Sequence, residues 1–284
     1  MNYILYNPKA NANKGESRAK ALDEILQGQK LEHRNVLEIK DYKAFLSGLK
    51  EDDVIILVGG DGSINHFVND VAGIDFSNKV LYYAAGTGND FLKDLDLDAA
   101  GGPYDITKYL KNLPSVEVNG KKSLFVNGVG YGIDGYCCEV ADQMHEQGIE
   151  EVNYASIAIK GLLGKFKPRN ATVTVDGKKQ SFKKAWIAAT MVGRYYGGGM
   201  MNAPKQDRLD KDGKLSLVLF HGSGKIHTLM IFPSIFKGEH VKHTKNVAVF
   251  EGHDITVEFD GPCALQIDGE TVLAVTKYHA TSWK

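Results

Sequence analysis

The protein lacks the features that mark membrane, secreted and disulfide-rich chains. None of its apolar runs approaches the roughly 18 residues that a membrane-spanning helix requires. The first ten residues, MNYILYNPKA, do not have the basic and apolar regions of a signal peptide. Three cysteines, two of them adjacent at Cys137 and Cys138, are too few for a disulfide framework. We therefore expect a cytoplasmic protein.

An excess of one charge is missing as well. The 34 lysine and arginine residues nearly balance the 35 aspartate and glutamate residues, so the sequence does not have the basic field that is typical of nucleic-acid-binding proteins. CxxC and HExxH spacings are also absent from the sequence. Nucleic acid is therefore not an expected partner, and an anionic ligand would need a local site.

What is present is the composition of an ordinary globular protein, 43% hydrophobic and 24% charged over 284 residues. The first 115 residues alternate short apolar runs with segments whose apolar residues recur at helical spacing. The runs predict strands at 3–6, 35–39, 54–58 and 80–84, and the periodic segments predict helices at 19–26, 42–49, 64–71 and 104–112. Strands that alternate with helices favour a parallel sheet with helices on its faces.

From about Pro114 the pattern changes to an alternation of apolar and polar residues with a period of two. It predicts strands at 115–118, 171–175, 214–220, 246–250 and 254–259. Asp176-Gly177 predicts a hairpin turn after one of these strands, and one amphipathic helix is expected at about 153–165. We therefore expect two domains, residues 1–115 and residues 116–284, of which the second is mostly antiparallel.

Two glycine-rich loops follow neighbouring predicted strands. GGDGS begins at Gly59 and AGTGND begins at Ala85. Such loops expose backbone N–H groups beside a helix N-terminus, which suits phosphate, although a tight turn with Asp61 or Ser63 as the helix N-cap is the alternative for either loop alone. Because the carboxyl ends of parallel strands meet at one sheet edge, the pair favours a nucleotide-phosphate and Mg²⁺ site. The loop after the first strand, NPKANANKG, should lie at the same edge.

Two further motifs are open to more than one interpretation. GYGIDG (130–135) has the spacing of a dinucleotide-binding fingerprint, but a clear second strand and an acid about 20 residues later do not follow it. A tight turn is therefore the favoured interpretation. DGE (268–270) follows an apolar strand, and by spacing alone it is an ordinary hairpin turn.

Taken in order, these motifs resemble the catalytic family of diacylglycerol kinases, whose superfamily includes bacterial lipid kinases, sphingosine kinases and, more distantly, NAD kinases. The resemblance covers almost the whole chain, and GTGNDF argues against an NAD kinase. The motifs that carry it are NPKAN (7–11), GGDGSINHFVN (59–69), GTGNDF (86–91), NGVGYGIDG (127–135), YYGGGM (195–200) and DGE (268–270).

The resemblance implies an α/β protein with two domains. The N-terminal domain would be a parallel-sheet, NAD-kinase-like Rossmann-type nucleotide-binding domain, and the C-terminal domain a mostly antiparallel β-sandwich, with ATP and lipid meeting between them. The implied reaction is the ATP- and Mg²⁺-dependent transfer of the γ-phosphoryl group to a lipid hydroxyl, with diacylglycerol as the expected acceptor. A kinase for another lipid or alcohol (a sphingoid base, ceramide or phosphatidylglycerol) and a catalytically silent nucleotide-binding regulator stay as alternatives.

The resemblance also assigns roles to individual residues. Asp268 would be the general base for the lipid hydroxyl, Glu270 would support the base or the metal, and Asp61 would share in catalysis. Mg²⁺ would be organised by Asp61 and Asp90, and Asp210 and Asp212 are candidate ligands of a structural metal. The nucleotide would be held by Asn7, Lys9, Gly59, Gly60, Gly62, Ser63, Asn65, Gly86, Thr87 and Asn89.

The sequence departs from the family pattern in three places. Lys93 replaces an arginine and loses its bidentate fork. The segment 204–213 is longer than usual, so the register of its acids is open, and the tail after DGE is short, so any return of the chain to the first domain is brief. A lipid acceptor implies peripheral contact with a membrane, for which 155–169 and 229–245 are candidate segments, although packing of these segments on the sheet is favoured. A homodimer is also open.

Overall fold

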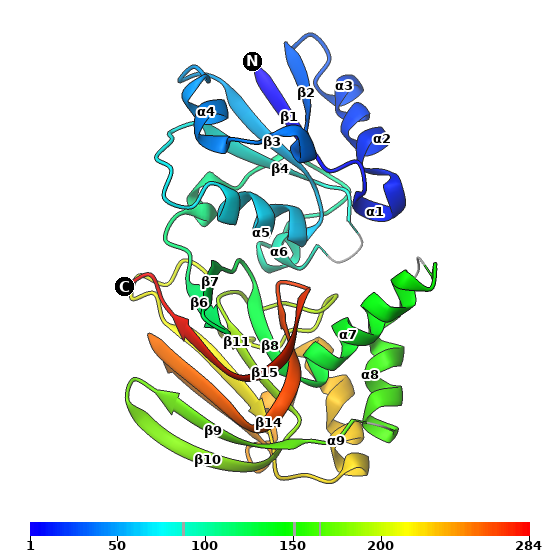
Figure 1. Ribbon diagram of the computed structural model, residues 1–284, viewed down its shortest axis with the longest axis vertical. Coiled ribbons are helices and arrows are strands. Elements are labelled where there is room, and N and C mark those ends of the chain that lie inside the picture. The colour runs from blue at the N-terminus through cyan, green and yellow to red at the C-terminus, as the bar shows by residue number, and fades with distance from the viewer. Residues whose placement is uncertain (87–88, 150–151, 165) are drawn as a thin grey trace. The chain divides into compact units, whose positions relative to one another are not determined.

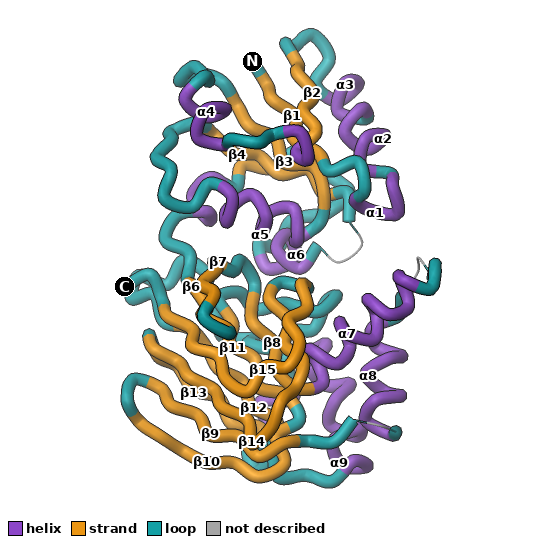
Figure 2. The backbone as a smooth tube through the Cα atoms, in the orientation of Figure 1, coloured by secondary structure: helices purple, strands orange, loops and turns teal. Residues whose placement is uncertain are grey.

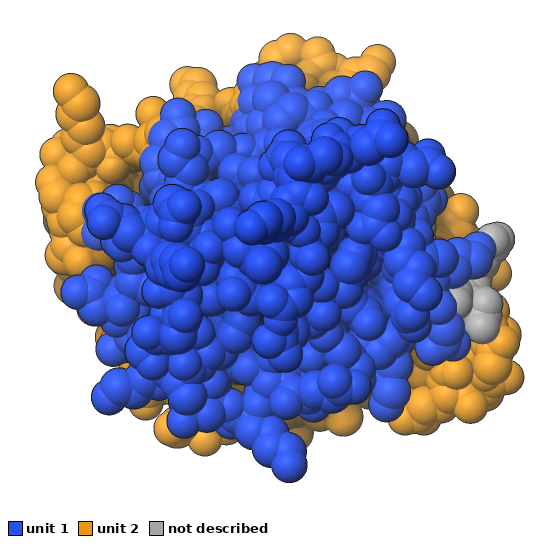
Figure 3. Space-filling view, turned by 90° about the horizontal axis from the view of Figure 1, so that it is seen from above, with its two compact units in different colours: residues 1–112 blue, residues 113–284 orange. Residues whose placement is uncertain are grey.

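The structure, a computed structural model, describes residues 1–86, 89–149, 152–164 and 166–284. They form two compact units, Met1–Asn112 and Leu113–Lys284, which are coloured separately in Figure 3. The first unit is α/β and the second is mostly antiparallel β (Figures 1 and 2). The predicted fold class is therefore confirmed.

The first unit is built on a five-stranded sheet with the order β2-β1-β3-β4-β5. Its first four strands run parallel, and only β5 is antiparallel to its neighbour β4. All four parallel strands therefore place their carboxyl ends at one edge. The strands are β1 (Asn2–Tyr6), β2 (Leu31–Asn35), β3 (Val54–Gly59), β4 (Lys79–Ala84) and β5 (Tyr104–Asp105).

Helices cover both faces of this sheet because its strands are apolar on both sides. On one face Ile4 and Ile56 pack against Ala19 of α2 and Leu22 of α3. The next residues along the same strands point to the opposite face, which carries α4 and α5. The helical segments are α1 (Ala10–Asn13), α2 (Gly15–Lys20), α3 (Leu22–Ile25), η1 (Val36–Glu38), α4 (Tyr42–Ser47), α5 (Asp61–Asp70), α6 (Asp90–Asp94) and η2 (Thr107–Leu110).

Two predicted elements of the first unit are wrong. The strand expected at 35–39 lies earlier, at Leu31–Asn35, because the Asn35 side chain accepts a hydrogen bond from the Leu37 N–H and starts the 3₁₀ turn η1. The helix expected at 104–112 is instead β5 followed by η2. Tyr104 pairs with Tyr82 of β4, so this segment extends the sheet.

The second unit contains a ten-stranded antiparallel sheet. Eight strands follow the order β13-β12-β11-β8-β14-β15-β6-β7, and β9 pairs with both β14 and β10. One core cluster takes Leu217 from β12, Val173 from β9 and Val116 from β6, so strands that are far apart in the pairing order enclose a shared core. The strands are β6 (Ser115–Val118), β7 (Lys121–Leu124), β8 (Gly128–Gly132), β9 (Arg169–Val175), β10 (Lys178–Ala185), β11 (Ile187–Met191), β12 (Leu215–Phe220), β13 (Val247–Gly252), β14 (Asp254–Ile267) and β15 (Glu270–Thr281).

Helices of the second unit pack against the side of the sheet that carries Trp186 and Phe220. They are α7 (Ile133–Glu146), α8 (Tyr154–Leu163), α9 (Lys225–Ile231), η3 (Phe232–Lys237) and η4 (His240–Lys242). Asn153 caps α8 by accepting a hydrogen bond from the Ser156 N–H. Over the described part of the chain, no helix has the length and apolar character needed to cross a membrane.

Candidate functional site

The two glycine loops of the first unit touch each other through their backbones. A Cβ added to Gly86 would lie 2.7 Å from the Gly60 Cα, closer than real Cβ atoms approach backbone. The Gly59 carbonyl accepts hydrogen bonds from the Ala85 N–H at 2.8 Å and from the Tyr82 hydroxyl at 2.9 Å. The ends of β3 and β4 are thereby joined in one glycine-lined surface, as expected for neighbouring parallel strands.

Asp61 ties the two loops together from the first turn of α5. Its Oδ2 accepts a hydrogen bond from the Asp90 N–H at 2.8 Å, and its Oδ1 accepts one from the Phe91 N–H at 3.1 Å. These N–H groups belong to the first turn of α6, where a carboxylate also interacts favourably with the helix dipole. Asp61 therefore has a structural role that the sequence did not show, and its role toward Mg²⁺ stays a prediction.

Asn89 has a buried side-chain oxygen to which the described residues donate no hydrogen bond. The residue is left-handed, with φ of 44°, and its Nδ2 donates to the Gly86 carbonyl at 2.9 Å. Its Oδ1 is buried and has no hydrogen-bond partner among the described residues, which is costly unless a ligand or water supplies one. Asp61, Asp90 and Asn89 together offer oxygen donors of the kind Mg²⁺ prefers. Thr87, a predicted phosphate contact, lies outside the described residues.

A cavity of about 210 Å³ opens beside the GGDG loop, at the carboxyl edge of the sheet. Asn7 and Ser63, both predicted from the sequence, contribute to its wall, whereas the other described residues predicted to hold the nucleotide do not. Asn7 orders its own loop, because its Oδ1 accepts the Lys9 N–H at 3.0 Å. The lining residues are Leu5, Asn7, Val36, Leu37, Tyr42, Leu57, Val58, Ser63, His66, Phe67 and Asp70.

The sequence reasoning missed the polar residues at the far side of this cavity. Tyr42 comes from α4, and His66 and Asp70 lie one turn apart on α5. Burial and the charge of Asp70 raise the pKa of Tyr42 to about 12. Burial also raises the pKa of Asp70, with His66 acting in the opposite direction. The only sequence signal was the i, i+4 spacing of His66 and Asp70.

In the second unit, DGE forms the tight turn of the β14–β15 hairpin. Asp268 and Gly269 have φ values of 49° and 98°, as a two-residue turn of type I′ requires, and Ile267 pairs with Glu270. The Asp268 carboxylate is held by backbone N–H groups of the segment that leads into β8. Oδ2 accepts from Val126 at 2.6 Å, and Oδ1 accepts from Asn127 at 2.8 Å and Gly128 at 2.9 Å.

Asp268 and Glu270 consequently differ in their surroundings. Three N–H donors stabilise the ionised form of the Asp268 carboxylate, so this group clamps the turn to the chain before β8. Glu270 is exposed at the start of β15, and its charge contributes to the raised pKa of Cys138 on α7, after burial and two aspartates. The turn conformation was the favoured interpretation of this motif. The catalytic roles of both acids stay predictions.

The segment 204–213 also forms hydrogen bonds with the residues that lead into β8. Arg208 donates hydrogen bonds to the Val126 carbonyl and, at 3.0 Å, to the Asn127 Oδ1. The Asp210 carboxylate accepts the Lys214 N–H at 3.0 Å and the Asp212 N–H at 3.3 Å, which hold its pKa below the ordinary value. Within the described ranges, no group of three or more histidine, cysteine, aspartate or glutamate side chains is placed to hold a metal ion. The structural metal at Asp210 and Asp212 stays a prediction.

Asp134, within GYGIDG, is a buried carboxyl group that the sequence did not single out. It lies in the first turn of α7, and its Oδ2 accepts a hydrogen bond from the Tyr196 hydroxyl at 2.5 Å. Burial raises the pKa of Asp134 to about 7, although the Tyr196 hydrogen bond acts in the opposite direction. A Cβ on Gly130 would come within 2.8 Å of the Asp134 Cβ and 2.6 Å of the Gln266 Nε2. The glycine therefore allows Asp134 to lie beside the strand that leads to DGE.

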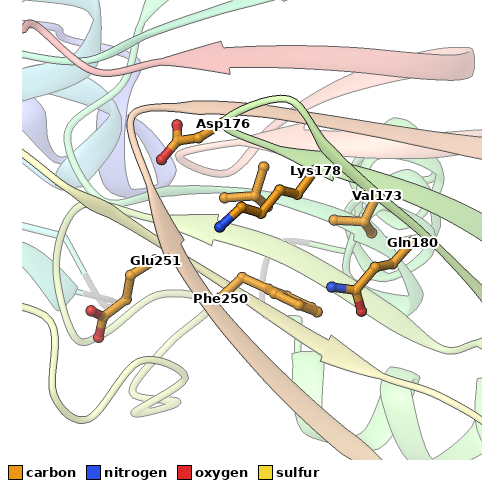
Figure 4. A pocket seen from close by; sticks show the side chains of 7 residues that line it. Val173, Asp176, Lys178, Gln180, Phe250 and Glu251 are labelled. Carbon is orange, nitrogen blue, oxygen red and sulfur yellow. The ribbon is translucent and has the colours of Figure 1, made fainter.

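A second hollow, of about 230 Å³, lies in the second unit between β10 and β13. Figure 4 shows Lys178 and Gln180 on one side of it and Phe250 and Glu251 on the other. None of the residues predicted for the site contributes to its described lining. We assign it no function.

Two family models match the chain. The diacylglycerol kinase catalytic domain matches residues 2–118, and the YegS C-terminal NAD kinase beta sandwich-like domain matches residues 127–280, more than half of the chain.

Known proteins agree with these matches. A diacylglycerol kinase of Mycobacterium tuberculosis is 26% identical over 235 residues, which covers 78% of this chain and 74% of that protein. YtlR of Bacillus subtilis, a candidate lipid kinase, is 24% identical over 313 residues, covering 99% of this chain and 96% of its own. A crystal structure of a candidate diacylglycerol kinase from Bacillus anthracis has a TM-score of 0.69 at 19% identity, covering 99% of this chain and 91% of that one. This last likeness concerns the fold alone.

Proposed function

Because the chain belongs to the diacylglycerol kinase catalytic family and carries the YegS-type C-terminal domain, we propose that it is an ATP- and Mg²⁺-dependent lipid kinase. It transfers the γ-phosphoryl group of ATP to the hydroxyl of a lipid, and diacylglycerol is the acceptor that we expect first. The observation that carries the proposal is the backbone contact between Gly60 and Gly86 beside the 210 Å³ cavity. Phosphoryl transfer depends mainly on positioning and charge neutralisation, which such loops supply.

The first unit binds the nucleotide. The purine ring fits the cavity, whose wall combines apolar side chains with Asn7, Ser63 and His66. The phosphates follow along the backbone of Gly59, Gly60 and Gly62, where N–H groups and the N-terminus of the ten-residue helix α5 favour negative charge. Asp61, Asp90 and Asn89 would hold the Mg²⁺, which neutralises phosphate charge when it is bound.

The second unit activates the acceptor hydroxyl. We assign the general base to Glu270, because the Asp268 carboxylate already accepts three backbone hydrogen bonds. Asp268 is then a positioning residue that fixes the turn, and Glu270 extends from that turn toward solvent. A general base contributes typically 10²–10⁴-fold to the rate. This assignment reverses the roles that the resemblance gave to the two acids.

The test is a transfer assay with purified protein, labelled ATP, Mg²⁺ and lipids dispersed in detergent micelles. Diacylglycerol should yield labelled phosphatidic acid, and chelation of Mg²⁺ should stop the reaction. Ceramide, a sphingoid base and phosphatidylglycerol form the comparison panel. A labelled product from one of these instead would change the acceptor and leave the kinase in place. No labelled product from any of the four would refute the proposed function.

A further inference from the structure

Two helices of the second unit expose large apolar side chains to solvent. On α8, Ile159 and Leu163 are 41% and 58% exposed, and on α9, Ile226 and Met230 are 74% and 67% exposed. Each pair is spaced i, i+4, so its members lie on one face of their helix. Each helix therefore presents an apolar face to solvent.

The two faces belong to adjacent helices. α8 and α9 are in contact (Figures 1 and 2), and the Lys225 ammonium group donates a hydrogen bond to the Gly164 carbonyl at 2.6 Å. Lys225 directly precedes Ile226, and Gly164 directly follows Leu163. The bond therefore joins the end of one apolar face to the start of the other. We call these four side chains, Ile159, Leu163, Ile226 and Met230, the apolar platform.

The fold does not require this platform. α8 already buries Ile157 and Leu162, and α9 already buries Ile231, in the cluster around Trp186. The favoured expectation that these segments pack on the sheet is met by those residues. The exposed residues are additional to these buried ones. Large apolar side chains exposed on two contacting helices are typical of an interaction site.

The two segments that carry the platform are basic, although α7, which packs against α8, carries Glu139, Asp142 and Glu146. Residues 153–169 and 221–238 together contain six lysine and arginine residues and no aspartate or glutamate. Lys160 on α8, Lys167 after it and Lys237 at the end of η3 are exposed. The whole chain carries a formal net charge of −1, so this basic rim is a local feature. An apolar face with basic flanks is what an interfacial helix needs to lie on an anionic bilayer.

We propose that the apolar platform and its lysines dock the protein on an anionic lipid bilayer. The choice of a bilayer as partner rests on the proposed function, because the acceptor of a lipid kinase is held in one. In the docked state Ile226 and Met230, the most exposed pair, enter the boundary between headgroups and acyl chains. Lys160 and Lys237 contact the anionic headgroups.

The first experiment measures binding alone, by flotation with phosphatidylcholine vesicles that contain or lack about 30% phosphatidylglycerol. The wild type should bind the anionic vesicles and release them at high salt. The double variant Ile226→Ser/Met230→Ser should lose on the order of 10- to 100-fold in affinity, because it removes two insertable side chains. Lys160→Gln/Lys237→Gln should lose roughly fivefold per lysine at low salt.

A matched control changes two exposed apolar residues elsewhere. Ile25 on α3 and Val249 on β13 are 50% and 45% exposed, and Ile25→Ser/Val249→Ser should bind vesicles like the wild type. Equal binding by the platform variant and this control would overturn the proposal. Equal binding of the wild type to vesicles with and without phosphatidylglycerol would also overturn it. So would self-association of the wild type that the platform variant abolishes, because the platform would then contact a second copy of the chain.

The second experiment separates docking from catalysis. With a short-chain, water-dispersed diacylglycerol as acceptor, the platform variant should turn over like the wild type, whereas with acceptor in anionic vesicles it should be slower by the factor lost in binding. Failure of the wild type with both acceptors would refute the kinase and leave the binding result standing. Equal losses with both acceptors would overturn the docking role.

Discussion

The substitution Asp268→Asn distinguishes a structural carboxylate from a catalytic one. Both Asp268 oxygens accept backbone N–H groups, at 2.6 Å from Val126 and at 2.8 and 2.9 Å from Asn127 and Gly128. An asparagine tolerates the left-handed conformation, so the backbone of the turn is not the problem. Its single oxygen, however, can serve only one of the two sets of donors. Its NH₂ group must then face a buried N–H group.

The cost follows from these contacts. A buried donor that loses its partner costs about 1–3 kcal/mol, and hydrogen bonds to a charged group are at the upper end of the usual range. We therefore expect Asp268→Asn to destabilise the protein by about 2–3 kcal/mol. For a domain of this size, that corresponds to a loss of roughly 5–10 °C in melting temperature.

Thermal unfolding followed by circular dichroism, combined with the transfer assay, tests this reasoning. Asp176 supplies the control, because it occupies the same kind of turn with φ of 47° and uses a single oxygen for the His253 and Asp254 N–H groups. Asp176→Asn can keep both bonds and should lose much less. Glu270→Gln should melt like the wild type and lose about 10²–10⁴-fold in kcat. If Asp268→Asn melts within about 1 °C of the wild type but loses that factor in kcat, Asp268 is the base and the clamp argument is wrong.

Three further substitutions test other parts of the structure. Gly86→Ala should move the two glycine loops about 1 Å apart and lower kcat/KM for ATP by on the order of 10²-fold. The control is Gly48→Ala, whose Cβ meets only ordinary contacts and which should leave the kinetics unchanged. Burial raises the pKa of Asp134 from 3.8 to about 7. The protonated side chain therefore stabilises the fold most below pH 4, and this contribution is lost as the pH rises to about 7. The melting temperature of Asp134→Asn relative to the wild type should therefore rise between about pH 4 and pH 7 and stay level above pH 7. A difference in melting temperature that is constant with pH would contradict the raised pKa. Arg208→Lys removes the guanidinium group that donates two hydrogen bonds to the segment before β8. The free energy of unfolding in urea should fall by about 1–2 kcal/mol. An unchanged unfolding midpoint would show that this contact is not important for stability.

The sequence predicted those elements whose apolar pattern is set by burial. β3 and β4 are central strands, covered on both faces, so their apolar runs stand out. β2 was misplaced because it is an edge strand of polar residues, LEHRN, whose place depends on pairing with β1. The prediction of a helix at 104–112 is wrong for a related reason. Its helical spacing is real, but hydrogen bonds to β4 decide its conformation, and a sequence window does not contain them.

The candidate site could be predicted only in part, because short motifs show which residues are special but not what they contact. The glycines of GGDG and GTGND indicated close backbone approach, and the structure supplies the partner, which is the other loop. Asp61 and Asp268 both bind backbone N–H groups far away in the sequence, and no local pattern reports such contacts. Asp134 was hidden for the same reason, because its burial depends on Tyr196, 62 residues later.

The contact between Gly60 and Gly86 also limits how the site can change by mutation. A Cβ on Gly86 would lie 2.7 Å from the Gly60 Cα, whereas a Cβ on Gly60 would lie 3.5 Å from the Gly86 Cα, which is an ordinary contact. The limit therefore applies at position 86, where compensation would normally come from a smaller residue on the opposite side. Both positions already carry the smallest residue, so no substitution at Gly60 can make room for a side chain at 86. A screen for suppressors of Gly86→Ala should therefore return true revertants and changes in the surrounding loops, but none at position 60. Position 86 is therefore expected to stay glycine, whatever lipid the second unit selects.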